Sequence, residues 1–175
     1  STRHRRIDGC KRAAHGTGVV EHHIGAVREP DLVAGQLDDV QVAAADLDAH
    51  GHADALNLTL SVSGEEILID PGTYDYFKFP EWRNYFRGTR AHNTIEVDDL
   101  DKSEILGPFL WGRRATTKVL RWESSDNGGV VEGEHDGYSR LIDPVTHRRK
   151  VTLNAEEQIV LITYTIGSEK SHVVK

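Results

Sequence analysis

HGHADALNLTL (residues 50–60), ILIDPGTY (67–74) and RGTRAHNT (87–94) are the three stretches that decide the fold of this chain. In the first stretch, leucines alternate with polar residues, which is the period-two pattern of a strand with one buried face. The second is a short apolar run that fits a buried strand. It ends at Pro71, which cannot donate a hydrogen bond to a strand ladder. The stretches therefore predict strands whose ends carry polar side chains.

Two imidazoles and one carboxylate stand at the ends or starts of these predicted strands: His52, Asp70 and His92. This is a plausible set of ligands for a divalent metal, and the ligand types favour zinc. His50 lies two residues before His52, so both rings would point to the same side of an extended backbone. The predicted zinc site requires that three segments distant in the sequence converge.

The pattern beyond residue 53 is that of an all-β protein. Further strands are expected at residues 93–97, 116–122, 129–134, 150–153 and 158–166. Helix signals are scarce, and only residues 80–86 suggest a single helical turn. The sequence shows no internal repeat and no Gly-rich phosphate loop.

Four ordered motifs carry a resemblance to a known family: HGHADALNLTL, LIDPGTYDY, YFRGTRAHNTIEVDD and GEHDGYSRLIDPVTHRR. Together they resemble the C-terminal domain of the heparinase II/III-like polysaccharide lyases. The resemblance implies an enzyme of two parts, an incomplete helical toroid followed by a layered antiparallel β-sandwich. It also implies cleavage of acidic polysaccharides, such as heparan sulfate or alginate, by β-elimination.

The resemblance also implies roles for individual residues. His52, Asp70 and His92 would bind zinc, His50 would face the substrate cleft as a catalytic residue, and Tyr74 would act close to it. We expect the zinc to be chiefly structural and to fix the orientation of His50. Three protein ligands leave a fourth position open, however, which usually signals a catalytic metal.

We divide the chain into residues 1–47, an unassigned segment that is diverged or poorly ordered, and residues 48–175, the β-sandwich domain. The chain is expected to be a fragment that lacks the helical toroid and is incomplete at its C-terminal end. It shows no signal peptide and no apolar run long enough to span a membrane. The resemblance nevertheless suggests a bacterial periplasmic or secreted protein.

The net charge of −7 argues against general nucleic-acid binding. A local basic cluster of Arg83, Arg87 and Arg90 lies among aromatic residues just before His92. Arginine guanidinium groups bind carboxylate and sulfate well, so this cluster is a candidate site for an acidic polysaccharide. The alternative is an ordinary solvated turn.

Asn93 and Asp54 each lie close to a predicted zinc ligand, and either could orient an imidazole through its free ring nitrogen. For Asp54, an ordinary structural role is the favoured interpretation. Later basic residues, Arg148 and Arg149 among them, are expected to lie on a solvated face of a sheet.

Two other functions remain open on the sequence alone. In a cupin-like metal oxygenase, the H-x-H pair and a later His would bind iron, but the Glu expected a few residues after the pair is missing. In a non-catalytic carbohydrate-binding sandwich, the aromatic and Arg cluster around Trp82 would be the binding platform.

Overall fold

The computed structural model describes residues 12–14, 18–24, 37–42, 51–62, 64–125 and 127–175. Its larger layer is a five-stranded antiparallel sheet in the order β2-β11-β10-β9-β8. In that order, the strands are Gly18–Ile24, Ile159–Gly167, Thr146–Asn154, Gly128–His135 and Thr117–Ser125. Four of these strands follow the expected β pattern, with slightly different ends.

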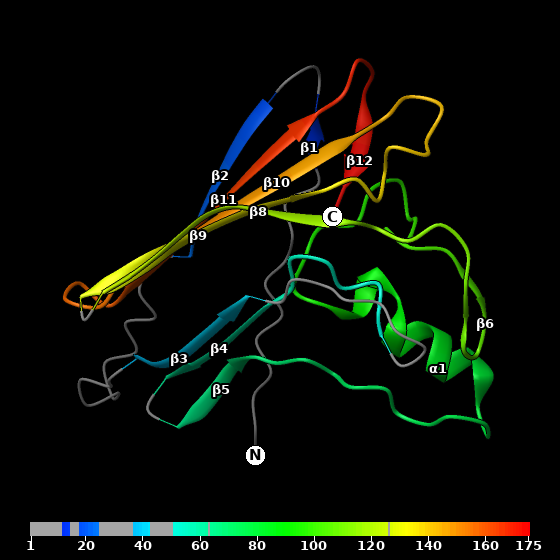
Figure 1. Ribbon diagram of the computed structural model, residues 1–175, viewed down its shortest axis with the longest axis horizontal. Coiled ribbons are helices and arrows are strands. Elements are labelled where there is room, and N and C mark those ends of the chain that lie inside the picture. Colours follow the sequence, from blue (N-terminus) through cyan, green and yellow to red (C-terminus); the bar gives the residue numbers. More distant parts are fainter. Residues whose placement is uncertain (1–11, 15–17, 25–36, 43–50, 63, 126) are drawn as a thin grey trace.

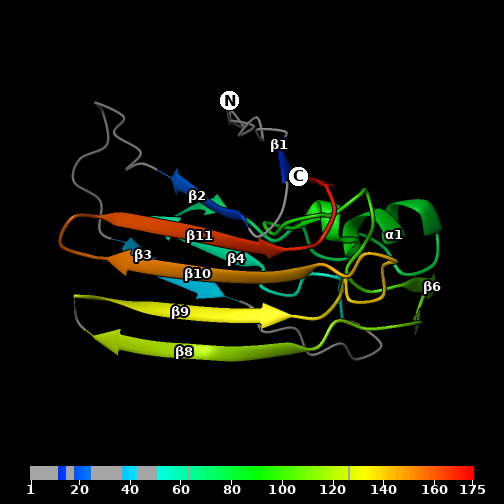
Figure 2. The ribbon, with the colours of Figure 1, turned by 90° about the horizontal axis from the view of Figure 1, so that it is seen from above.

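The second layer is a three-stranded antiparallel sheet of β3 (Leu37–Val42), β4 (Leu58–Val62) and β5 (Glu65–Leu68). Figure 1 shows this layer facing the larger sheet, and Figure 2 shows the larger sheet from above. The remaining elements are β1 (Arg12–Ala14) paired with β12 (His172–Val174), β6 (Ile105–Gly107) paired with β7 (Leu110–Trp111), α1 (Pro80–Arg87) and the 3₁₀ turn η1 (Thr89–Ala91).

The two layers are joined by an apolar core in which side chains of β4 meet side chains of β10 and β11. Leu58 and Leu60 of β4 pack against three residues of the larger sheet, Val151, Val160 and Ile162. Burying one such side chain stabilises the fold by about 1.5–3 kcal/mol. The predicted layered antiparallel β-sandwich is therefore confirmed, and so is the buried leucine face of residues 56–60.

A second core lies at the end of the sandwich nearer the C-terminus and centres on Tyr138. Its ring is fully buried beside Ile95, Val97 and Ile166. The Tyr138 hydroxyl contacts the carbonyl oxygens of Ile95 at 3.3 Å and Leu100 at 3.1 Å. This core holds the loop that follows η1 against the larger sheet.

Three sequence predictions need correction. Residues 93–97 do not form a strand, because Asn93 bonds to the ends of other segments and Val97 makes only isolated bridges. Ile67 and Ile69 are 43% and 45% exposed, since β5 is an edge strand with one neighbour. Pro80 begins a helix of eight residues, longer than the expected single turn. No helix in the described residues is long and apolar enough to cross a membrane.

Candidate metal centre

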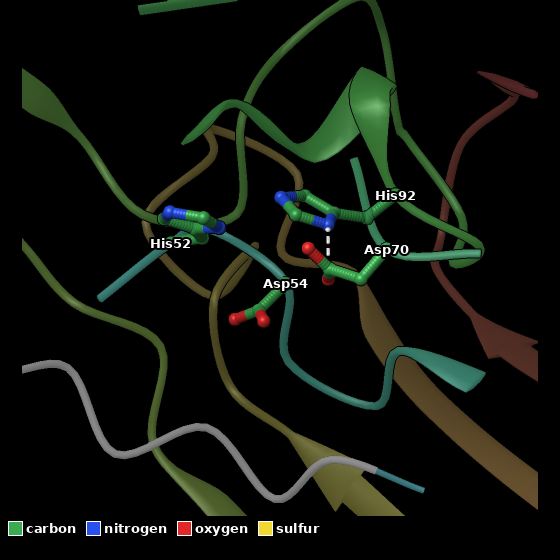
Figure 3. Close-up of side chains that lie close together, drawn as sticks. All are labelled: His52, Asp54, Asp70 and His92. Carbon is green, nitrogen blue, oxygen red and sulfur yellow. Dashed lines mark hydrogen bonds and ion pairs between the residues drawn. The ribbon is translucent and has the colours of Figure 1, made fainter. Parts of the chain in front are cut away.

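The three predicted metal ligands converge at one point between the layers, and Asp54 joins them. One nitrogen or carboxylate oxygen from each of His52, Asp54, Asp70 and His92 lies within 4.8 Å of the others. Figure 3 shows the four side chains close together, with His92 directed at Asp70. His52 and Asp54 precede β4, Asp70 follows the end of β5, and His92 follows η1 directly.

Asp70 is held by three hydrogen bonds. Its Oδ2 accepts from His92 Nδ1 at 3.1 Å and from Asn57 Nδ2 at 3.0 Å, and its Oδ1 accepts from the Gly72 backbone N–H at 2.8 Å. With the proton on Nδ1, a neutral His92 ring carries a lone pair on Nε2. That Nε2 is buried and has no hydrogen-bond partner among the described residues, so the lone pair faces the interior.

Both imidazoles are held in the neutral form that binds metals. Burial lowers the pKa of His92 to about 4, although the charge of Asp70 opposes this shift. Burial also lowers the pKa of His52. The two ring centroids are 5.2 Å apart, and His52 Nε2 lies 2.9 Å from Thr73 Oγ1. At neutral pH neither ring has to lose a proton before it can bind a cation.

Asp54 and Asn57 are functional candidates whose roles the sequence analysis missed. Burial raises the pKa of Asp54 to about 6, so its carboxylate is mostly ionised at neutral pH inside the cluster. Asn57 is 2% exposed, and its Oδ1 accepts a hydrogen bond from the Asn93 backbone N–H at 2.9 Å. The available signal for Asp54 was its spacing of two residues from His52; Asn57 offered only a polar position within the strand pattern.

A family model described as heparinase II/III-like, C-terminal, matches residues 36–175. The chain belongs to this family. Two solved structures of a heparinase III gene product, one with methylated lysines, share the fold with TM-scores of 0.57 and 0.56 at 21% and 18% identity. Each match covers 92% of this chain and 22% of the solved chain, and no curated protein matches.

In this heparinase II/III-like domain, the structure describes only one of the two predicted catalytic residues, Tyr74. His50 lies outside the described residues. Tyr74 directly follows Thr73, has a φ of 68° and is 61% exposed. Its ring stacks on Phe86 with centroids 5.4 Å apart. Tyr74 therefore presents a hydroxyl-bearing ring on the surface, next to the residue that contacts His52.

The sequence analysis considered Asn93 as a residue that could orient the ring of His92. In the structure, the described hydrogen bonds of its side-chain nitrogen go to backbone carbonyl groups. Its Nδ2 donates to the carbonyl oxygens of Leu58 at 3.0 Å and Ile69 at 2.8 Å. Asn93 thus ties the start of β4 to the residue before Asp70. Through these bonds it orders the backbone of the segments that carry His52 and Asp70.

Two of the three predicted substrate arginines lie in the interior of the domain. Arg83 is 1% exposed and Arg87 is fully buried. Arg83 donates to the carbonyl oxygen of Pro108 at 2.9 Å and 2.8 Å, and Arg87 donates to Gly107 and Pro108. Both point from α1 into the β6–β7 hairpin, a direction that the linear sequence does not reveal. Arg90 is exposed and lies 3.7 Å from Asp99.

Proposed function

We propose that this chain is the β-domain of a polysaccharide lyase that cleaves uronate-containing acidic polysaccharides by β-elimination, with zinc bound at the His/Asp cluster. The observation that carries the proposal is the convergence of His52, Asp54, Asp70 and His92 in a chain of the heparinase II/III-like family. Membership of the family supports the class of reaction. The cluster gives the matched motifs a common role, because each of its side chains lies in one of them.

The residues present fit a zinc ion. Zinc favours imidazole nitrogens and carboxylate oxygens in a compact set of about four ligands. His52, Asp70 and His92 would hold the ion, and Asp54 would supply a fourth oxygen or accept a hydrogen bond from a bound water. When bound, the ion would act as a structural cross-link between three loops. The three loops would then form a wall of the substrate cleft with a defined shape.

β-Elimination removes the proton at C5 of the uronate, breaks the C4–O4 bond and leaves a double bond between C4 and C5, and the departing O4 takes up a proton. That proton is weakly acidic, so the enzyme has to neutralise the adjacent carboxylate and place a base at C5. We assign His50 and the exposed Tyr74 to the catalytic side of the cleft, and Arg90 to contact with the acidic substrate. Arg83 and Arg87 have no part in substrate contact here, because their guanidinium groups are buried.

The remaining catalytic groups would come from a helical toroid in the same protein, upstream of this domain. The chain spans only 22% of the solved heparinase III chains, so the complete active site is assigned to the longer protein. A polymeric acidic substrate fits a periplasmic or secreted location.

The test has two parts. Elemental analysis of the purified chain is expected to find one zinc per chain, and the His52→Ala variant is expected to lose it. The chain with its natural upstream region should then convert an acidic polysaccharide to products with the ultraviolet absorbance of unsaturated uronates. Equal trace metal in both proteins would refute the metal assignment. Metal-independent glycan binding without products would favour a carbohydrate-binding sandwich.

One observation favours a second candidate, a metal oxygenase. His52, Asp54 and His92 form a set of two His and one carboxylate within the cluster if Asp70 is not a ligand. Such a set can bind iron(II) with positions left for oxygen. This arrangement replaces the Glu whose absence counted against a cupin-like enzyme. Iron in place of zinc, together with oxygen uptake by the iron-loaded chain, would support it.

A further inference from the structure

Two buried basic side chains, Lys102 and Arg149, contact the segments that carry the proposed metal ligands. Lys102 is 1% exposed and Arg149 is 3% exposed. The sequence predicted a solvated position for Arg149, but its place on β10, between β9 and β11, directs it into the space between the layers. Neither residue makes a salt bridge among the described residues, so their contacts with backbone oxygens need an explanation.

Lys102 joins two of the ligand-bearing segments. Its Nζ donates to the carbonyl oxygen of Ala55 at 2.8 Å and to Thr94 Oγ1 at 2.6 Å. Ala55 is the residue after Asp54, and Thr94 lies two residues after His92. The Thr94 hydroxyl is also 3.1 Å from the Ala55 carbonyl oxygen, so the same pair of segments is in direct contact.

Arg149 joins the same two segments a second time. Its Nη1 donates to the carbonyl oxygens of Leu56 and Asn93, the latter at 2.6 Å. Its Nη2 donates to the Tyr164 hydroxyl at 2.7 Å, which anchors the guanidinium to β11. Leu56 has a φ of 61°, a left-handed conformation that costs free energy for a leucine and needs support from its surroundings.

We propose that Lys102 and Arg149 are positioning residues for the cation site, setting the distance between the His52–Asp54 segment and His92. This inference rests on the proposed zinc site. Burial lowers the pKa of Lys102 well below its usual value. The positive charge of Arg149 opposes a divalent cation, so the contribution of the two residues is geometric, and the carboxylates Asp54 and Asp70 offset that charge. A metal site tolerates displacements of only about 0.5 Å in its ligands, which makes two bridges between the same loops effective.

Two variants test the proposal while a basic side chain remains at both positions. Arg149→Lys keeps the cation but loses the planar fork that spans two carbonyl groups. Thr94→Val removes one acceptor of Lys102 and leaves Lys102 in place. Zinc affinity is measured by competition with a chromophoric chelator, and site geometry by the visible absorption of bound cobalt(II). The metal-free free energy of unfolding is measured in parallel.

Each variant is expected to weaken zinc binding by about tenfold or more and to change the cobalt spectrum. Tyr138→Phe is the matched control. It also removes buried hydrogen bonds to the backbone, but these bonds go to Ile95, Val97 and Leu100, outside the 52–57 and 92–94 segments. It should lower metal-free stability while leaving the zinc affinity and the cobalt spectrum unchanged.

The outcomes separate this inference from the proposed function. If the wild-type chain binds neither zinc nor cobalt(II), the proposed metal site itself is wrong. If the wild type binds zinc and both variants match its affinity and spectrum, the positioning role is wrong and the metal site stands. Equal loss of affinity in Tyr138→Phe would reduce the effect to general destabilisation and would also overturn the inference.

Discussion

Asn57 connects all three ligand segments through one buried amide. Its Nδ2 donates to Asp70 and its Oδ1 accepts from the backbone N–H of Asn93, the neighbour of His92. Asn57 itself belongs to the segment that carries His52 and Asp54. A side chain in this position affects the fold and the metal affinity together, because the hydrogen bonds that stabilise the loops also aim the ligands.

Asn57→Ala is therefore expected to cost about 1–3 kcal/mol of unfolding free energy, since it leaves buried polar partners unpaired. It should also weaken zinc binding by about 10- to 100-fold. Chemical denaturation and chelator competition measure the two effects. Asn154→Ala is the control, because Asn154 Oδ1 accepts from Glu157 N–H at an exposed hairpin and not from a segment of the cluster. Wild-type zinc affinity in Asn57→Ala would contradict this role for Asn57.

Among the elements, the start of β9 shows a close approach of two backbones. Gly128 has a φ of 131°, and a Cβ added there would lie 2.1 Å from the carbonyl oxygen of Leu153 on β10. Gly128→Ala should therefore cost at least about 3 kcal/mol. Gly64 also has a positive φ, but a Cβ added there would have no described atom within 4 Å apart from its chain neighbours. Gly64→Ala is therefore expected to lower the unfolding free energy by about 1 kcal/mol. Thermal unfolding compares the two variants, and equal losses would show that the steric contact is unimportant.

β12 is attached to the rest of the domain through His172. Its Nδ1 lies 2.6 Å from Asp98 Oδ2, and its Nε2 lies 2.8 Å from Asp143 Oδ2. The hydrogen bond to Asp98 raises the pKa of His172, and the bond to Asp143 adds to the shift. Two carboxylates facing both ring nitrogens favour the imidazolium form, because both nitrogens must then donate.

The stability that this pairing provides is fully present below the unfolded-state pKa of about 6.5 and is lost as pH rises through the higher folded-state pKa. The unfolding free energy should therefore fall as the pH rises above about 6.5 in the wild type. His172→Gln should flatten this part of the curve. Urea unfolding across the range measures the slope, and identical slopes for the two proteins would rule out His172 as the cause.

On the scale of the whole molecule, a bound cation would link the loop before β4, the loop after β5 and the turn after η1. A ligand that binds only the folded state raises stability, by about 2.7 kcal/mol at a free concentration of one hundred times Kd. Zinc should raise the Tm of the chain, and a chelator should lower it. In His92→Ala, zinc should leave the Tm nearly unchanged. An equal shift in that variant would place the binding elsewhere.

The sequence predicted the sandwich from local signals, and it predicted the His/Asp cluster from the resemblance of its motifs to a known family. Leucine alternation at residues 56–60 specifies one buried strand face, and the heparinase-like motifs specify which polar residues belong together. The position of Arg87 was not predictable in the same way. Its burial depends on the β6–β7 hairpin, which lies against α1 and offers carbonyl oxygens at Gly107 and Pro108.

Sequence alone thus determined the all-β class, the family and the identity of three side chains that converge, His52, Asp70 and His92. Only the tertiary structure decided that Asp54 joins the cluster, that Asn57 ties its loops, and that Lys102 and Arg149 bond to the same two segments. The physical reason is that a polar side chain takes its role from the groups it meets. Here those groups come from strands and loops far away along the chain.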